Sequence, residues 1–133
     1  MGGCWLICGG RSFGDYRLLE AIMRGTVEKH GTPGSVISGA ASGADALGVR
    51  WAQQARVPTI RTFPANWGKY GTAAGPIRNQ QMIDEGRPDL VVAFPGGRGT
   101  DDMVRRAIAA EVECIIVSKN GTARSIKFSG GEG

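Results

Sequence analysis

The sequence contains very little histidine and cysteine. His30 is the only histidine, which excludes a Ser-His-Asp triad and a metal site built from several histidines. We place it at the C-terminal end of the first helix, as a cation favourable to the helix dipole. The three cysteines, Cys4, Cys8 and Cys114, are an odd number without zinc-binding spacing. No disulfide framework or metal site is therefore predicted, and their apolar surroundings favour buried, reduced thiols in the cytoplasm.

Long apolar runs are also missing. No run approaches the roughly 18 residues needed to span a membrane, and the N-terminal stretch lacks the basic region of a signal peptide. We therefore expect a cytoplasmic protein without membrane contact. The chain has 16 basic and 12 acidic residues, for a net charge of +4, but no long basic run. This charge permits an anionic partner and does not favour a nucleic acid, whose binding face needs a basic stripe or patch.

Glycine, by contrast, is abundant. It makes up 22 of the 133 residues, more than twice the usual share of roughly 7%. The glycines gather in clusters between short apolar runs. This distribution predicts loops whose backbone closely approaches another group.

Strand-like and helix-like segments alternate along the chain. Strands are predicted at 4–8, 35–38, 59–63, 90–94 and 114–117, and helices at 16–29, 44–55, 75–85 and 101–111. Such alternation predicts one doubly wound α/β domain over residues 1–118, with a mostly parallel sheet of five or six strands and helices on both faces. Residues 119–133 are predicted to form a tail with a short edge strand at 125–128 and a flexible, glycine-rich end.

The glycine clusters all follow strands. Because ligands of such sheets bind outside the carboxyl ends of the strands, this edge is the predicted functional edge. The strongest signal is FPGGRGTD at 94–101, where free helix N–H groups and a bidentate Arg98 suit a phosphate, and Thr100 can cap the helix or donate to the phosphate. Alternatively, Asp101 and Asp102 satisfy the helix dipole and the segment is only a tight turn.

Two further loops can also be interpreted either as ligand-binding segments or as purely structural ones. The segment SGAASGAD at 38–45 either contacts a ligand or is only a helix start at which Ser42 and Asp45 form a capping box. Trp67 and Tyr70 could stack on a base or ribose, close over the cleft as a lid, or merely anchor their loop. Neither a Walker P-loop nor a G-x-G-x-x-G fingerprint is present, which disfavours a Walker-type ATPase and an ordinary NAD dehydrogenase.

The order of these motifs resembles the YspA/YpsA-related branch of the SLOG superfamily. The motifs are GGRSFGD, SGAASGADALGVRWA, FPANWGKYGTAAGPIRNQQM and LVVAFPGGRGTDDMVRRA, and the resemblance covers about residues 4–117. It implies a Rossmann-like fold and a nucleotide or nucleotide-derived ligand. The superfamily includes the DprA DNA-processing proteins, ligand-sensing domains of antiviral systems and the LOG phosphoribohydrolases, and small members of this branch are frequent in phages and actinobacteria.

The resemblance also assigns roles. It places Gly96, Gly97, Gly99 and Thr100 in a phosphate-binding PGGxGT turn, and makes Arg78 the arginine that precedes this turn in the hydrolases. The glutamate that follows the turn in the hydrolases is replaced by Met103, whose thioether cannot activate water. Nucleotide binding is therefore the favoured function. The alternatives are a nucleotide N-glycosidase that uses Asp101 or Asp102 with Arg78, and a DprA-like module associated with DNA.

The predicted site draws on four loops, which follow the strands predicted at 4–8, 35–38, 59–63 and 90–94. Arg98, Arg78 and Arg11 are expected to hold phosphate, and Asp45 to take a ribose hydroxyl or a Mg²⁺ ion bound with the nucleotide; no resident cofactor is predicted. The full set of predicted ligand-binding residues is Gly9, Gly10, Arg11, Ser12, Ser38, Gly39, Gly43, Ala44, Asp45, Trp67, Arg78, Asn79, Pro95, Gly96, Gly97, Arg98, Gly99, Thr100 and Asp101.

The resemblance further implies a homodimer or higher homo-oligomer, often with the helices beside the PGGxGT turn in the interface. Val49 and Trp51, on the helix predicted at 44–55, offer apolar surface beyond what a small core needs.

Overall fold

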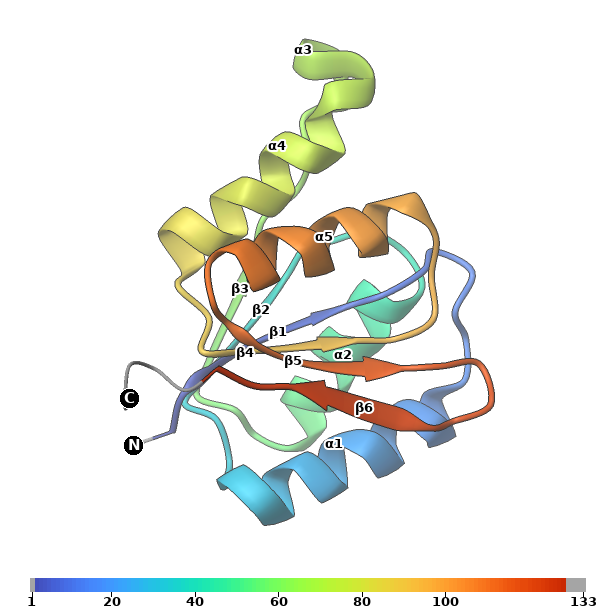
Figure 1. The fold of residues 1–133 in the computed structure, drawn as a ribbon, viewed down its shortest axis with the longest axis vertical. Helices are drawn as coiled ribbons and strands as arrows, with labels where there is room; N and C mark the ends of the chain where they lie inside the picture. The colour runs from blue at the N-terminus through green and yellow to red at the C-terminus, as the bar shows by residue number, and fades with distance from the viewer. Residues whose placement is uncertain (1, 129–133) are drawn as a thin grey trace.

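The computed structural model describes residues 2–128 and contains one six-stranded sheet. The strand order is β3-β2-β1-β4-β5-β6, and all neighbours are parallel except β6, which pairs antiparallel with β5 at the edge (Figure 1). The strands are β1 Cys4–Cys8, β2 Ser35–Ser38, β3 Thr59–Thr62, β4 Leu90–Ala93, β5 Glu113–Val117 and β6 Ala123–Ile126. The predicted doubly wound, mostly parallel sheet is confirmed.

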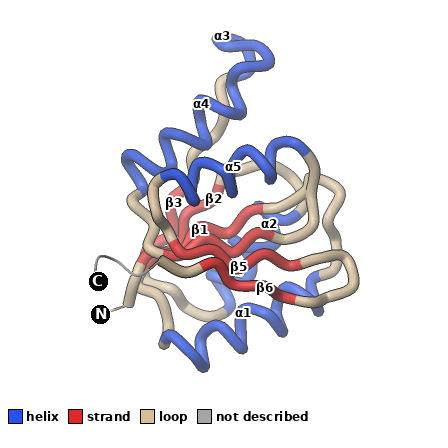
Figure 2. Tube along the Cα trace, in the orientation of Figure 1, coloured by secondary structure: helices blue, strands red, loops and turns tan. Residues whose placement is uncertain are grey.

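Helices cover both faces of the sheet. α1 and α2 lie on one face, and α4 and α5 on the other (Figure 2). The short α3 and the start of α4 project beyond the sheet (Figure 1). The helical segments are α1 Tyr16–His30, α2 Ala44–Gln54, α3 Trp67–Tyr70, the 3₁₀ turn η1 Gly71–Ala73, α4 Ala74–Gln81, the π-turn η2 Met82–Gly86 and α5 Arg98–Ala109.

The core divides into two layers because alternate strand residues face opposite sides. Trp5 and Ile7 pack with Leu19 and Met23 beneath α1, whereas Leu6 packs on the other face, in the layer that α4 and α5 cover. β4 is buried along its whole length, as a central parallel strand covered on both faces should be.

The ends of α1 agree with the sequence. Asp15 is its N-cap and accepts a hydrogen bond from the N–H of Leu18 at 3.0 Å, and Gly31 is its C-cap. His30 lies in the last turn, with its Nε2 4.0 Å from a carboxylate oxygen of Glu113. Both lie at the edge of the sheet opposite the glycine loops.

The starts of two other helices differ from prediction. α5 begins at Arg98 instead of residue 101, because the carbonyl of Gly97 already accepts the first helical bond, from the N–H of Asp101 at 3.0 Å. Thr100 therefore lies inside the first turn and does not cap it. The N-cap of α2 is Gly43 instead of Ser42, and neither helix has a side-chain cap, so the predicted capping box is wrong.

Three smaller differences lie in the loops and the core. The predicted loop after β3 contains α3 and η1, and β6 lies two residues earlier than the predicted strand at 125–128. The predicted flexible end at 129–133 lies outside the described residues. Trp51 is buried and stacks on Trp5 with ring centroids 6.2 Å apart, so it offers no surface for a partner.

All three cysteines are free. The predicted burial is confirmed for Cys8 and Cys114, whereas Cys4 is partly exposed. Burial raises the pKa of the Cys8 thiol far above its ordinary value, so this group is protonated at neutral pH. Within residues 2–128, no helix is long and apolar enough to cross a membrane.

Gly43 is required by the fold for two reasons. Its φ is +73°, in the left-handed region that residues with a Cβ rarely adopt. A Cβ there would also collide with the carbonyl groups of Gly10 and Arg11. Gly25, in the middle of α1, is the opposite case, because it is exposed and a Cβ there would meet no atom within 4 Å.

We expect the same substitution to have opposite effects at these two glycines. Gly43→Ala should lower the free energy of unfolding by about 2 kcal/mol or more, because it adds backbone strain to the collision. Gly25→Ala should raise it by about 0.5–1 kcal/mol through helix propensity. Urea unfolding measures both, and a neutral Gly43→Ala would mean that the loop after β2 does not hold this conformation.

Candidate functional site

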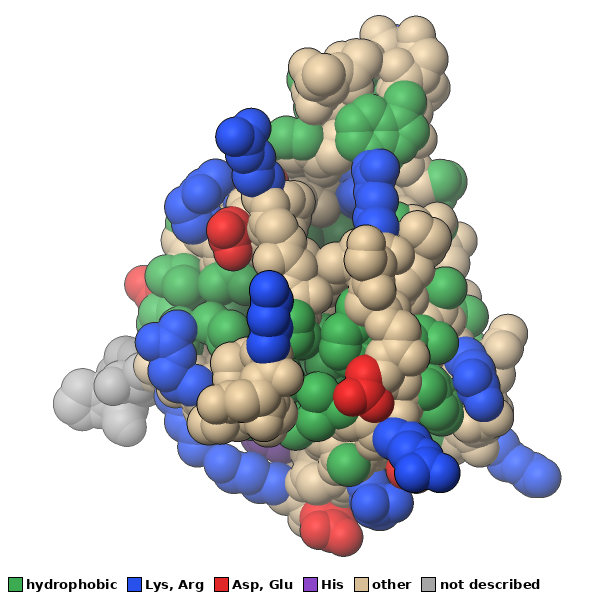
Figure 3. Space-filling view, turned by 90° about the vertical axis from the view of Figure 1, so that its right-hand side faces the viewer, with side chains coloured by type: hydrophobic (Ala, Val, Ile, Leu, Met, Phe, Trp, Pro, Cys, Tyr) green, Lys and Arg blue, Asp and Glu red, His purple; other side chains and the backbone are tan. Residues whose placement is uncertain are grey.

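The main cleft lies where the strand order reverses. β1 and β4 are neighbours from the two halves of the sheet, and ligands of doubly wound folds bind at this point, outside the carboxyl ends. The cleft has a volume of about 610 Å³. In Figure 3, which faces this edge, basic side chains lie on both sides of a hollow below the projecting helices. The predicted residues that line the cleft are Gly9, Gly10, Arg11, Asp45, Trp67, Arg78, Asn79, Gly97, Arg98, Gly99 and Thr100.

One wall of the cleft is the first turn of α5. The leading N–H groups of a helix have no acceptor within it, so those of Arg98, Gly99 and Thr100 are available at this wall. A Cβ on Gly97 or Gly99 would meet no atom within 4 Å. The packing of the protein therefore does not require glycine at these two positions, in contrast to Gly43.

The floor of the cleft holds a buried carboxylate and a partly buried guanidinium. Asp45 is 6% exposed, and its Oδ2 accepts a hydrogen bond from the N–H of Ala41 at 3.1 Å. The guanidinium of Arg78 donates to the carbonyl of Gly39 and, at 3.3 Å, to that of Phe63. Both charged groups lie against Gly39, where a Cβ would collide with Arg78 and lie 2.9 Å from the Asp45 carboxylate.

Burial shifts the pKa of both Asp45 and Arg78. It raises the pKa of Asp45, although the Ala41 N–H and the nearby Arg78 and Arg11 oppose this shift. It lowers the pKa of the Arg78 guanidinium, which Asp45 opposes. Each charge is thus held by the fold in a place where it is poorly solvated. Such groups are typical of functional sites, because a ligand can supply the missing interactions.

An aromatic side chain forms the outer wall. Trp67 is 47% exposed and lines the cleft, and the guanidinium carbon of Arg11 lies 5.1 Å from its ring centre. Tyr70 instead lines a separate groove on the outer side of α4. The structure thus divides the aromatic pair, and of the two only Trp67 can meet a ligand in the cleft.

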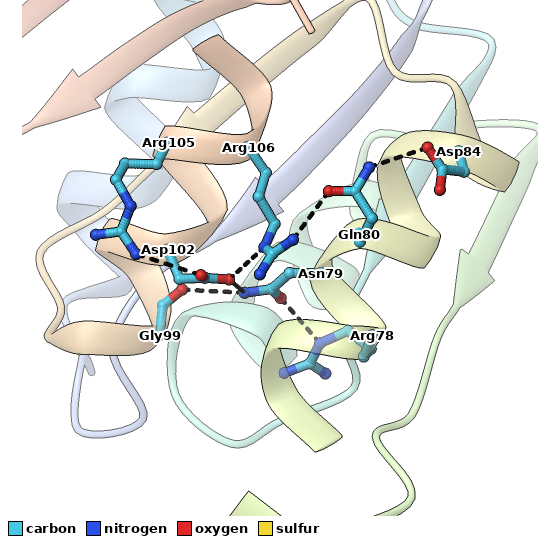
Figure 4. Close-up of polar contacts among 8 residues, drawn as sticks. All are labelled: Arg78, Asn79, Gln80, Asp84, Gly99, Asp102, Arg105 and Arg106. Atoms are coloured by element: carbon cyan, nitrogen blue, oxygen red, sulfur yellow. Dashed lines mark hydrogen bonds and ion pairs between the residues drawn. The ribbon is translucent and has the colours of Figure 1, made fainter. Parts of the chain in front are cut away.

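A polar network joins α4 to α5 behind the cleft (Figure 4). The amide of Asn79 donates to the carbonyl of Gly99 at 3.2 Å and to Asp102 at 3.0 Å, and its oxygen accepts from Arg78 at 3.0 Å. Arg106 donates to Asp102 at 2.8 Å and to Gln80 at 3.0 Å. Both amide hydrogens of Asn79 are therefore engaged, and this side chain positions the turn that carries Gly99.

The two candidate carboxylates after the turn face different surroundings. Burial opposes the charge of Asp102, but hydrogen bonds from Arg106 and Asn79 outweigh it and hold the pKa of Asp102 below its ordinary value. Asp101 is exposed and lines a second cleft on the far side of the turn. Met103 is 1% exposed, packs in the core and reaches the floor of the main cleft. Neither aspartate therefore occupies the place of the glutamate that the hydrolases carry.

Several predicted residues lie outside the lining of the main cleft. Ser38 is fully buried and its hydroxyl bonds the backbone of Asp45 and Ala40. Ala44 is buried as well. Ser12, Gly39 and Gly43 are also absent from its lining. Pro95, Gly96 and Asp101 line a second cleft instead.

The sequence analysis missed some lining residues. Arg105 lies seven residues after Arg98, so helical spacing from the turn would have indicated it on the same face. Asp102, four residues after Arg98, was predicted only as a candidate catalytic carboxylate, and it lines the cleft as well. Cys8, Ala41 and Met82 are small or apolar and carry no such signal. The remaining missed residues come from the start of α4 and the segment before it: Thr72, Gly75 and Pro76.

The geometry defines a Rossmann-like domain with a cleft at the switch point of its sheet, and the comparisons with known proteins agree with this fold. The model of the YspA, cpYpsA-related SLOG family matches residues 6–70. The Gene 61 protein of Mycobacterium phage D29 is 37% identical over 86 residues, which cover 60% of this chain and 68% of the phage protein. No solved structure matches.

The chain belongs to the YspA, cpYpsA-related SLOG family. This confirms the resemblance read from the glycine motifs, of which the first two lie within the matched residues. Membership points to a function connected with nucleotides.

The burial of Asp45 predicts a pH-dependent effect of its removal. Because its pKa is raised in the folded state, the charged carboxylate destabilises the fold at neutral pH. This penalty disappears below the pKa of the unfolded chain, about 3.9, where the group is protonated in both states. Asp45→Asn keeps the acceptor for Ala41, so it should melt at a higher temperature than the wild type at pH 7. The difference should shrink as the pH falls towards 4, and identical pH profiles in calorimetry would contradict the burial of a charge.

Proposed function

We propose that this protein binds a nucleotide, with its phosphate on the first turn of α5 and its nucleoside in the main cleft. The observation that carries the proposal is the pair Gly97 and Gly99. Both border the cleft beside free helix N–H groups, and neither is needed by the surrounding packing. Glycine at such positions lets an anion approach the backbone N–H groups directly.

The arginines at the α5 wall of the main cleft favour a phosphate ligand. Arg98 and Arg105 both line the cleft and come from α5 itself. A guanidinium can pair with two phosphate oxygens at once, and such charge-assisted bonds are about twice as strong as neutral ones. Arg78 lies deeper and is already bonded to two carbonyls, so it contributes charge to the floor of the cleft.

The opposite parts of the cleft suit a nucleoside. The exposed ring of Trp67 offers a stacking surface, which accepts any base because every base has a π-face. Asp45 lies buried at the floor, where its carboxylate can accept a hydrogen bond from a ribose hydroxyl. The same carboxylate is the group we assign to a Mg²⁺ ion, should the nucleotide bring one.

We favour nucleotide binding without release of the base, because the cleft has a thioether at Met103 where a glycosidase needs a carboxylate. A glycosidase needs a carboxylate beside the sugar, and Met103 fills that place with a thioether. Asp102 is held in ion pairs with Arg105 and Arg106 at 3.3 and 2.8 Å. Asp101 lines the other cleft.

Gly99→Ala tests the phosphate site in a way that separates binding from folding. Alanine at this helical position should raise the free energy of unfolding by about 0.5–1 kcal/mol. Its methyl group should nevertheless keep phosphate from the first turn and remove at least one charge-assisted hydrogen bond, each worth about 1.5–3 kcal/mol. We therefore expect a more stable protein that binds AMP at least about tenfold more weakly by calorimetry.

Gly25→Ala is the matched control, since it is the same substitution in another helix and should leave the affinity for AMP unchanged. Equal AMP binding by Gly99→Ala and the wild type would contradict the phosphate site. Chromatography of the same samples reports the chemistry. Adenine released over many turnovers and lost in Asp102→Asn would establish the glycosidase instead.

We also propose that the expected homodimer forms through the outer groove of α4. This groove has a volume of about 670 Å³ and includes Tyr70 and Ile77, which are 41% and 42% exposed. Asp84 and Glu85 lie along it together with Arg106, so that it offers both charge signs to a second copy. The groove borders the helix beside the glycine turn, in keeping with the location implied by the family resemblance.

Light scattering tests this interface. At micromolar concentration the wild type should have twice the 14.0 kDa mass of the chain. We expect the dimer interface to bury about 1,200 Å² or more in total, which is the size of stable interfaces. Ile77→Asp places a charge in the groove and should give the single-chain mass with an unchanged circular dichroism spectrum. Ile108→Asp, at another exposed isoleucine, is the control and should stay dimeric. A wild type that scatters as one chain would contradict the dimer.

A further inference from the structure

A second cleft lies on the other side of the first turn of α5. It has a volume of about 420 Å³ and lies between α5 and the ends of β5 and β6. Its floor is apolar, with Phe94 and Val117 buried beneath it and Val104 and Ile116 in its lining. The basic side chains that line it are Arg105, Lys119 and Arg124. Nothing in the proposed function uses this cleft.

The two clefts share one wall. Thr100 and Arg105 line both, whereas Gly99 lines only the main cleft and Gly96 only the second. The free N–H groups of the helix therefore lie on a ridge between two hollows. A phosphate held on this ridge has room for a substituent on either side.

We propose that the ligand is a diester of diphosphate, with a nucleoside in the main cleft and a second sugar or nucleoside in the other. The inference rests on the proposed phosphate site at Gly97 and Gly99. Both volumes fall within the roughly 300–1,000 Å³ of small-molecule sites. A mononucleotide would use only one of the two hollows that meet at the ridge.

The second cleft has the groups that such an arm needs. Its apolar floor suits the face of a base or sugar, and the guanidinium of Arg124 can stack on a base. Asp101 is exposed at its edge and can accept a hydrogen bond from a sugar hydroxyl. Arg105, on the shared wall, can reach the bridging diphosphate from either side.

Calorimetry with AMP, ADP and P1,P2-diadenosine diphosphate tests the second arm. Adenine serves as the probe because stacking on an aromatic ring tolerates any base. ADP carries more negative charge than diadenosine diphosphate and the same two phosphates, so a preference for the diester cannot arise from charge. We expect the diester to bind at least about tenfold more tightly than ADP.

Two variants locate the effect. Val104→Trp fills the second cleft and should bring the affinity for the diester down to that for ADP, while AMP binding stays unchanged. Ile108→Trp, one turn further along α5 and in neither cleft, is the matched control. Arg124→Ala, on the exposed edge strand, should weaken only the diester and serves if the tryptophan disturbs the fold.

The outcomes separate the two proposals. Binding of AMP without any preference for the diester, or a preference that survives both variants, would overturn the second arm alone. Failure of all three probes to bind the wild type would overturn the phosphate site and this inference together.

Discussion

Two backbone hydrogen bonds of Gly10 hold together the edge of the sheet that carries the main cleft. Its N–H donates to the carbonyl of Pro95 at 2.9 Å, and its carbonyl accepts from the N–H of Ala44 at 3.1 Å. These bonds tie the loop after β1 to those after β4 and β2. A Cβ on Gly10 would lie 2.9 Å from the Cα of Gly96, so the backbones meet where no side chain fits. The shape of the main cleft depends on this close approach.

The glycines at this edge thus fall into two groups with different physical roles. Gly10, Gly43 and Gly96 are packed against neighbouring atoms, and the fold needs them. Gly97 and Gly99 border open space at the start of α5, and the surrounding packing does not require them. The glycines of this edge therefore meet a packing requirement at some positions and none at others.

Periodicity in the sequence was sufficient to predict the sheet, because buried strands and amphipathic helices impose their own patterns. The glycine loops indicated the edge at which the main cleft lies, because the carboxyl ends of parallel strands meet there. The starts of α2 and α5 were not predictable, because Gly43 and Gly97 replace side-chain caps through contacts made only in the fold. Likewise, α3 separates Trp67 from Tyr70, and only the tertiary bonds of Asn79 show that it supports the turn.

Amide NMR with added AMP examines the phosphate-binding turn directly, residue by residue. If the phosphate lies on the first turn of α5, the largest shifts will fall on the backbone N–H groups of Gly99 and Thr100, together with the indole N–H of Trp67. Shifts concentrated around Tyr70 and Ile77 on the outer side of α4, or at Gly31 on the opposite edge of the sheet, would contradict this placement.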